Sequence, residues 1–414
     1  MIKEYRRVLA IIAVLIFFTN LAVYLSFPDV ASVPPLYFII SFATLAGPIC
    51  LSRGSFALAR RSPIITWCYA FMMVSAVWLL VQQTPSETAW QAMRTRVLSV
   101  FVLLILLYVF CDENAQRWAR RAILCAVIMA VAINLYELFH PLTFSMVKGR
   151  SAGLYYNPNQ CGAALVLGMI MSIGLLRQRY RLFFVFITGL GVVLTVSRGA
   201  IVSWCVVLLS MILNGQISLK RSLVFAVAIL ASMTALVTFQ WDRVQYELTD
   251  IGVLNKDISQ RIESFVNPQD FAGDDSAAQR KEVLNGAWEM FADRPIWGYG
   301  VAASRDWGYE ISSHNQYLSL MVDHGILGFF ILPLIVLATI WRARGTARQI
   351  GSSFAAFILC WGFFSHNVLE EYYILLSFSL IASMSLLSNL DQSLENLRFV
   401  RTASPLTLPN PANL

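Results

Sequence analysis

Polar side chains inside or beside apolar stretches are the residues of this chain that could perform chemistry. Arg198 lies between two apolar half-segments, in Ser197-Arg198-Gly199, and a cation at membrane depth is costly unless it is paired or hydrated. It is either a structural arginine near a helix end or an anion site facing an outward cavity. A guanidinium suits a phosphate because its planar fork donates two parallel hydrogen bonds.

A second arginine, Arg280, opens a stretch whose apolar spacing predicts a helix over 277–293. Alone it would be an ordinary solvated arginine, but Trp288, Pro295 and Gly298-Tyr299-Gly300 follow it in order. The proline predicts the end of the helix. The two glycines predict a loop that folds tightly onto another element, which makes Arg280 a second candidate for anion binding.

His314-Asn315 stands where a charged segment gives way to an apolar one. An imidazole titrates near neutral pH, so His314 could accept the proton of a hydroxyl nucleophile. The alternative is a histidine bonded to backbone at a helix start. His366-Asn367 repeats the dipeptide near another segment end, where His366 is either a second site residue or an interfacial group.

Asn157-Pro158-Asn159 precedes a segment of small residues and is typical of a turn and helix cap. Lys148 and Arg150 come just before it, on the side of the membrane where basic residues are otherwise sparse, which favours an anionic ligand; Arg94 and Arg96 raise the same possibility more weakly. The candidate substrate-binding residues are Lys148, Arg150, Asn157, Asn159, Asn315 and His366.

Composition decides which elements must position these residues. The 414 residues are 57% hydrophobic and 13% charged, with a mean hydropathy of +0.63, whereas soluble domains carry about 25% charged residues. This excludes a soluble enzyme, a disordered chain and a nucleic-acid module. The sequence predicts an all-α polytopic membrane protein with about twelve transmembrane helices. The predicted spans are 8–27, 36–52, 63–82, 97–111, 122–140, 159–176, 182–196, 200–213, 222–240, 314–341, 349–366 and 372–388.

The formal charge of +7 marks topology rather than a nucleic-acid partner. If the N-terminus is cytoplasmic, 19 of the 31 basic residues fall in the segments that face the cytoplasm, as the positive-inside rule requires. Both termini are then predicted to be cytoplasmic. The first span lacks an obvious cleavage site, so we expect it to be retained as an anchor.

The predicted organisation has four parts. Residues 1–240 form a transmembrane bundle of about nine helices, and 314–388 a second of about three. Between them, 241–313 holds 20 of the 55 charged residues and is predicted as one long loop on the outer face that contains short helices. The tail 389–414 is rich in proline and asparagine and is predicted to be disordered.

Several kinds of site are not indicated. The seven cysteines lie in or beside apolar runs without Cys-x-x-Cys spacing, so neither a disulfide framework nor a zinc site is expected. The sequence has no Walker A motif, no dinucleotide fingerprint in a βαβ setting and no His-Glu-x-x-His. We therefore expect no metal and no cofactor.

Four stretches together resemble the O-antigen ligase/polymerase superfamily of bacterial inner-membrane proteins. They are Asn157-Pro158-Asn159, Ser197-Arg198-Gly199, the helix and turn from Arg280 to Gly300, and His314-Asn315 through Gly328. The resemblance implies a type C glycosyltransferase without metal. Such a protein moves a glycan from undecaprenyl diphosphate to a hydroxyl acceptor on the periplasmic face, either a lipid A–core sugar, another glycan or a protein.

The resemblance implies a role for the residues that match each motif. Arg198 and Arg280 would hold the donor diphosphate, and His314 would activate or position the acceptor hydroxyl. The expected reaction is a direct displacement that inverts the anomeric carbon. Asp323-His324-Gly325 departs from the usual pattern, in which the acidic residue directly precedes the glycine, so His324 complicates the assignment.

Three alternatives remain at this point. The motifs do not separate a ligase that acts on lipid A–core, which we favour, from a polymerase of the same superfamily. A flippase for lipid-linked oligosaccharide would also have about twelve spans, but it would favour paired halves and charges near mid-membrane. A scaffold without activity would leave the two arginines and the histidine without a purpose. The sequence leaves the oligomeric state open.

Overall fold

The described part of the chain is entirely helical. The computed structural model describes residues 2–82, 84–224, 275–308 and 313–403, with backbone only at 53, 275–280 and 391–403. No strand occurs within these ranges, which confirms the predicted all-α class for them. The principal helices are α1 (Ile2–Ala13), α2 (Leu21–Tyr24), α3 (Pro35–Cys50), α4 (Arg53–Ala59), α5 (Pro63–Val81), α6 (Glu87–Phe110), α7 (Glu113–Phe139), α8 (Pro158–Ser172), α9 (Gln178–Leu194), α10 (Arg198–Leu213), α13 (Asp275–Asp293), α14 (Gln316–His324), α15 (Ile326–Ile340), α16 (Gly345–Trp361) and α17 (Tyr372–Ala403).

Local signals fix where many of these helices begin. The Ser86 hydroxyl accepts the backbone N–H of Ala89 at 3.1 Å before α6, and the Asp112 carboxylate accepts that of Ala115 at 3.0 Å before α7. Proline occupies the first turn of α3, α5 and α8, where its missing N–H costs nothing.

Five helical segments are long and apolar enough to cross a membrane, by length and composition, within the described residues. They are α5, α6, α7, α8 with its 3₁₀ extension (Pro158–Leu175) and the first part of α17 (Tyr372–Leu390). The shorter apolar helices α3, α10 and α15 lie in three further predicted spans. The chain is thus a multi-pass membrane protein, whereas the total of about twelve spans remains a prediction. The predicted span 222–240 lies almost wholly outside the described residues.

The bundle is enclosed at its centre and apolar on its outside. Helix α8 and the first part of α17, Tyr372–Leu390, are mostly buried. Helix α5, by contrast, leaves Leu80 82% exposed and Tyr69 69% exposed, as expected of side chains that face lipid. Small residues let helices approach each other closely. A Cβ added at Gly162 on α8 would lie only 2.6 Å from the Cβ of Ala200 on α10.

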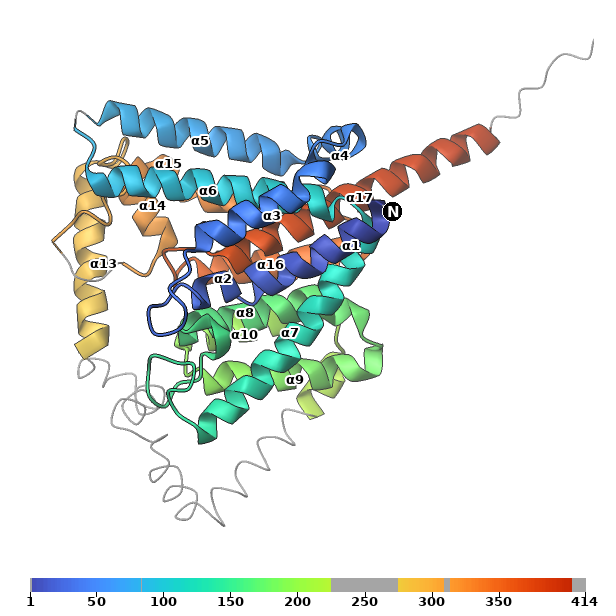
Figure 1. Ribbon diagram of the computed structural model, residues 1–414, viewed down its shortest axis with the longest axis horizontal. Helices are drawn as coiled ribbons and strands as arrows, with labels where there is room; N and C mark the ends of the chain where they lie inside the picture. The colour runs from blue at the N-terminus through green and yellow to red at the C-terminus, as the bar shows by residue number, and fades with distance from the viewer. Residues whose placement is uncertain (1, 83, 225–274, 309–312, 404–414) are drawn as a thin grey trace, which may run out of the picture.

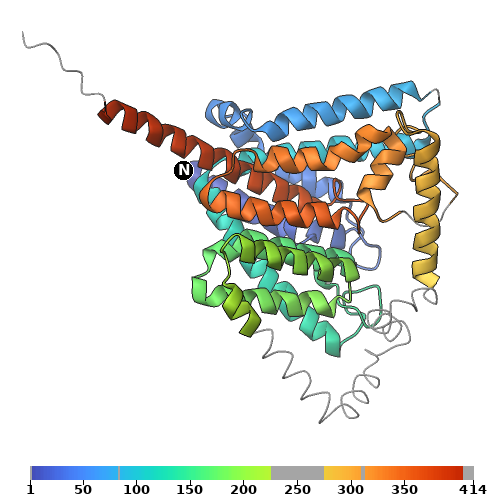
Figure 2. The same cartoon turned by 180° about the vertical axis from the view of Figure 1, so that it is seen from behind.

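Helix α13 lies across one end of the bundle, crossing the direction of the other helices (Figure 1). Figure 2 shows the same arrangement from behind. The beginning of α1 and the far end of α17 lie at the opposite end (Figure 1). The described chain therefore has α13 at one end, and the beginning of α1 and the far end of α17 at the other.

Three helix boundaries differ from the predicted ones. The apolar run 314–341 is two helices, α14 and α15, because Gly325 has φ +63° and ψ −154° and breaks the run. The first predicted span begins earlier, at Ile2, and its helix is interrupted at Asn20, which has φ +60°. Helix α17 continues to Ala403, whereas the sequence placed the start of a disordered tail at 389. Residues 404–414 lie outside the described residues.

The predicted helix over 277–293 is confirmed, and its end at Asp293 is followed by Arg294-Pro295, as expected. The rest of the predicted outer loop up to residue 274 lies outside the described residues.

Candidate functional site

The loop 362–371, between α16 and α17, joins the elements around the candidate site. The backbone N–H of Gln316, the first residue of α14, donates to the carbonyl of Gly362 at 2.7 Å. The Gln316 side-chain oxygen accepts the N–H of Val368 at 2.9 Å. Asn315 caps α14 by accepting the N–H of Leu318 at 3.1 Å. These bonds fix the start of α14, and with it His314, against the loop.

The structure brings His314 and His366 together. Their ring centroids are 5.3 Å apart and their planes meet at 76°. His314 has φ +48°, an uncommon conformation for a residue with a Cβ. Burial, together with the nearby His314 and Arg305 side chains, lowers the pKa of His366 to about 3. His366 is therefore a neutral imidazole at physiological pH, able to accept one hydrogen bond and donate another.

Arg198 is the first residue of α10, whose N-terminus meets the same loop. A Cβ added at Gly199 would lie 2.7 Å from the side chain of Phe364, two residues before His366. Gly199 packs against Phe364, and the neighbouring Ala200 packs against Gly162 of α8. The N-terminus of a helix attracts anions through its N–H groups and dipole, so Arg198 adds a guanidinium to a favourable position.

Arg150 is buried and serves the packing of the neighbouring helix ends. Its Nε donates to the Thr195 carbonyl at 3.0 Å, and its Nη2 donates to the Asn159 side-chain oxygen at 2.9 Å. Asn157 caps α8 by accepting the N–H of Asn159 at 2.9 Å. Lys148 is exposed in the preceding loop. Arg150, Asn157 and Asn159 thus hold together the ends of α8 and α9, three residues before Arg198.

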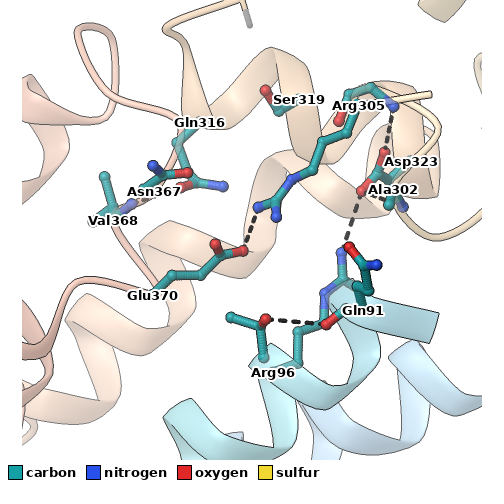
Figure 3. A network of polar contacts seen from close by, with 12 residues as sticks. Gln91, Arg96, Ala302, Arg305, Gln316, Ser319, Asp323, Asn367, Val368 and Glu370 are labelled. Atoms are coloured by element: carbon teal, nitrogen blue, oxygen red, sulfur yellow. Dashed lines mark hydrogen bonds and ion pairs between the residues drawn. The ribbon is translucent and has the colours of Figure 1, made fainter. Parts of the chain in front are cut away.

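A buried ion pair fastens the outer loop to the bundle. Arg96 on α6 and Asp323 on α14 meet at 3.2 Å, with side chains 8% and 6% exposed. Asp323 also accepts the backbone N–H groups of Ala302 at 3.1 Å and Ser304 at 3.0 Å (Figure 3). Arg96 therefore has a carboxylate partner inside the protein, which corrects our interpretation of it as a hint of an anionic ligand.

The turn 295–300 packs directly on the break between α14 and α15. The N–H of Ile326 donates to the Pro295 carbonyl at 2.7 Å. A Cβ added at Gly298 would lie 2.6 Å from the backbone nitrogen of Gly325, and one added at Gly325 would overlap the Ile296 carbonyl. The glycine pair Gly298 and Gly300 was expected to fold tightly onto another element, and it does so here.

Arg305 and Glu370 form an ion pair that the sequence did not suggest (Figure 3). It joins the outer loop to the 362–371 loop, and it lies beside a small cavity of about 30 Å³ that His366 also lines. Arg305 and Glu370 are 65 residues apart in the chain. No periodicity links them, so no sequence signal could have paired them.

A larger groove of about 390 Å³ opens between α13, α14 and α15. Trp288 of α13 and Tyr317, Phe329 and Phe363 give it an aromatic lining, and Asn315 reaches it beside His314. Aromatic rings of this kind can stack on sugars or hold apolar chains. Arg280 lies earlier on α13, and its side chain lies outside the described residues, so its place relative to Arg198 and His314 stays a prediction.

The site thus assembles around the 362–371 loop, which carries His366; His314 and Arg305 lie beside the loop, and the N-terminus of α10 packs against it. In the described part of the chain, no three acidic, histidine or cysteine side chains cluster in a way that could hold a metal ion. The arrangement combines cationic groups with a neutral imidazole at one end of the bundle. It could bind a phosphate and receive the proton of a hydroxyl group.

One family comparison bears on this site. Residues 182–333 match the family model described as O-antigen ligase. No curated protein matches the chain. The matched range contains three of the four stretches on which the resemblance rests, and it confirms that resemblance.

Proposed function

We propose, from the match of residues 182–333 to the O-antigen ligase family model, that the chain transfers a glycan from undecaprenyl diphosphate to a hydroxyl acceptor. The acceptor we favour is a sugar of lipid A–core, which would make the protein an O-antigen ligase. We place it in the bacterial inner membrane, with both termini cytoplasmic and the site periplasmic. The observation that carries the proposal is the contact of His314 with His366 in the loop that also packs on the start of α10.

The proposed reaction is a single displacement at the anomeric carbon, with inversion. The acceptor oxygen forms the new bond as the bond to the diphosphate oxygen breaks, and the acceptor proton passes to the His314 imidazole. Undecaprenyl diphosphate leaves with the negative charge. Arg198 and Arg280 stabilise that charge, and such preorganised electrostatic stabilisation is commonly the largest contribution to a rate.

We place the acceptor, or the first sugars of the donor, in the aromatic groove that Asn315 lines. Lys148, Arg150, Asn157, Asn159, Asn315 and His366 were predicted to bind substrate. Of these, Asn315 and His366 lie beside His314, so they remain our candidates for substrate contact. We assign Arg150, Asn157 and Asn159 to positioning Arg198, because their hydrogen bonds run to one another and to Thr195.

Transfer by purified protein in lipid nanodiscs tests the proposal, with labelled donor and with lipid A–core as acceptor. Arg198→Ala and Arg280→Ala should each abolish most transfer. His314→Ala should lose less than the double arginine variant, because a positioned base contributes roughly 10²–10⁴-fold. Arg60→Ala, at an exposed arginine beyond α4, is the matched control. Full activity in both single arginine variants would refute the site.

Product length separates the two members of the superfamily that we consider. One transfer onto lipid A–core identifies a ligase, whereas a ladder of lengthening glycans identifies a polymerase. Release of undecaprenyl diphosphate distinguishes either enzyme from a flippase, which would move the donor without cleaving it. Activity in the presence of EDTA tests the proposed independence from metal.

A further inference from the structure

A second groove lies away from the candidate site, on the membrane-facing surface between α1 and α7. It has a volume of about 500 Å³, within the range of about 300–1,000 Å³ that is usual for ligand sites. Its lining is almost wholly apolar, with Leu15 on one side and Ala122, Ala126, Met129 and Ile133 along α7. None of the residues assigned above to glycan transfer lines it.

The groove is long and runs along the helices. Its lining on α7 extends from Trp118 to Ile133, which corresponds to about 22 Å at a rise of 1.5 Å per residue. Half of a hydrocarbon core of about 30 Å is about 15 Å. The groove therefore has the length to receive one acyl chain from head-group level to beyond the middle of the bilayer.

At one end of the groove, the guanidinium groups of two arginines lie against the same tryptophan ring. The guanidinium carbon of Arg7, on α1, lies 3.8 Å from the centroid of the Trp118 ring, and that of Arg121, on α7, lies 4.8 Å from it. Trp118 and Arg121 both line the groove. Arg7 also pairs with Glu4 at 3.0 Å, with side chains 35% and 68% exposed, and a solvent-accessible pair of this kind contributes little.

Two guanidinium groups held against one indole repel each other, and a single anion between them relieves that repulsion. A tryptophan with arginines at a helix end is also typical of head-group depth in a membrane. Basic pockets between transmembrane helices are known to select anionic lipid head groups. The basic end and the apolar length therefore point to one molecule that has a phosphate at one end and a hydrocarbon chain at the other.

We propose that the groove between α1 and α7 binds an anionic phospholipid, with its phosphate between Arg7 and Arg121 and one acyl chain along Ala122, Ala126 and Met129. The lipid belongs to the leaflet at the end of the bundle that holds the start of α1. It would join the first helix of the chain to α7, which packs on α8 and α9. The proposal does not depend on the proposed glycan transfer.

Native mass spectrometry of the full chain in detergent tests this with phosphatidylglycerol and, as the zwitterionic comparison, phosphatidylcholine. The wild-type protein should retain one phosphatidylglycerol at least tenfold more tightly than phosphatidylcholine. Arg7→Gln/Arg121→Gln should remove that preference. Arg60→Gln/Arg61→Gln removes the same charge from exposed positions between α4 and α5 and should keep it.

Ala126→Phe fills the groove while leaving both arginines in place, so it tests the acyl-chain part separately. It should lose the tightly held lipid and keep the unfolding temperature measured without added lipid. Equal retention of both lipids by the wild-type protein, or undiminished retention in Ala126→Phe, would overturn the proposal. Crosslinking between two copies of Met129→Cys would also overturn it, because a second copy would then occupy the groove.

Discussion

Replacing Asp323 by asparagine tests whether the buried ion pair holds the outer loop in its place. Asp323 faces three donors: the Arg96 guanidinium and the backbone N–H groups of Ala302 and Ser304. Asparagine keeps the volume and one acceptor oxygen, but its amide nitrogen is a donor that must face another donor. The change also leaves Arg96 as a buried charge without its counter-ion.

The expected cost is large because both members of the pair are buried. Removing one partner of a buried ion pair costs about 3–5 kcal/mol, whereas a neutral hydrogen bond contributes about 0.5–1.5 kcal/mol. We expect Asp323→Asn to lower the free energy of unfolding by about 3–5 kcal/mol. The loop that carries Arg305 should detach from α14 before the whole bundle unfolds, because the Asp323 carboxylate that accepts the N–H groups of Ala302 and Ser304 is lost.

Two assays on purified protein in detergent report on this. Thermal unfolding measures the loss of stability, and trypsin measures access to the peptide bond after Arg305. Asp323→Asn should be cut there at least tenfold faster than wild type, and its glycan transfer should fall at least tenfold. Glu289→Gln removes an exposed carboxylate from α13, away from the scissile bond, and should change none of these quantities.

A double variant distinguishes the loss of the ion pair from a change in side-chain shape at Asp323. Arg96→Met/Asp323→Asn removes both charges. Its loss of unfolding free energy should therefore be smaller than the sum of the losses in the two single variants. Unchanged unfolding and unchanged cleavage in Asp323→Asn would refute the idea that this pair fixes the loop. Strictly additive losses in the double variant would refute the coupling between Arg96 and Asp323.

Two further predictions concern the neighbouring elements. Gly325→Ala should destabilise the protein by about 2 kcal/mol or more, because φ +63° is unfavourable for alanine and its Cβ would overlap the Ile296 carbonyl. The control is Gly308→Ala, where an added Cβ meets nothing within 4 Å. Equal losses of unfolding free energy in the two variants would contradict the argument. Burial raises the pKa of Glu371 from 4.5 to about 8, so folding takes up a proton and stability falls as pH rises from about 4.5 to about 8. Glu371→Gln keeps an acceptor for the Gln160 amide, which lies at 2.6 Å, and should flatten that pH dependence of the unfolding temperature, whereas parallel curves for variant and wild type would contradict it.

The sequence predicted helix positions well because hydropathy alone marks an apolar helix. The helix over 277–293 and the breaks around Ser197-Arg198-Gly199 are where the pattern placed them. The break at Gly325 was missed since a single glycine does not interrupt an apolar run. Its backbone conformation is imposed by the turn at Ile296, which is distant in the chain.

The candidate site was predictable only in part. His314 and His366 were singled out by their positions at segment ends, but their contact depends on how the 362–371 loop folds. Arg96 looked like a ligand-binding charge because its partner, Asp323, is 227 residues away. Pairings between distant residues carry no local signal, so sequence spacing identifies the charged groups without identifying their partners.

The two histidines near α14 that sequence reasoning left in competition differ in their burial and contacts. His324 is fully buried; its Nε2 lies 3.0 Å from an Arg96 nitrogen, and its ring contacts Trp78 edge-on at 5.5 Å between centroids. An acceptor hydroxyl could reach this imidazole only if Arg96 and Trp78 moved away. His314 is only partly buried and precedes Asn315, which lines the aromatic groove. We therefore propose that His314, rather than His324, receives the proton of the acceptor, because His324 belongs to the buried network of Arg96 and Asp323.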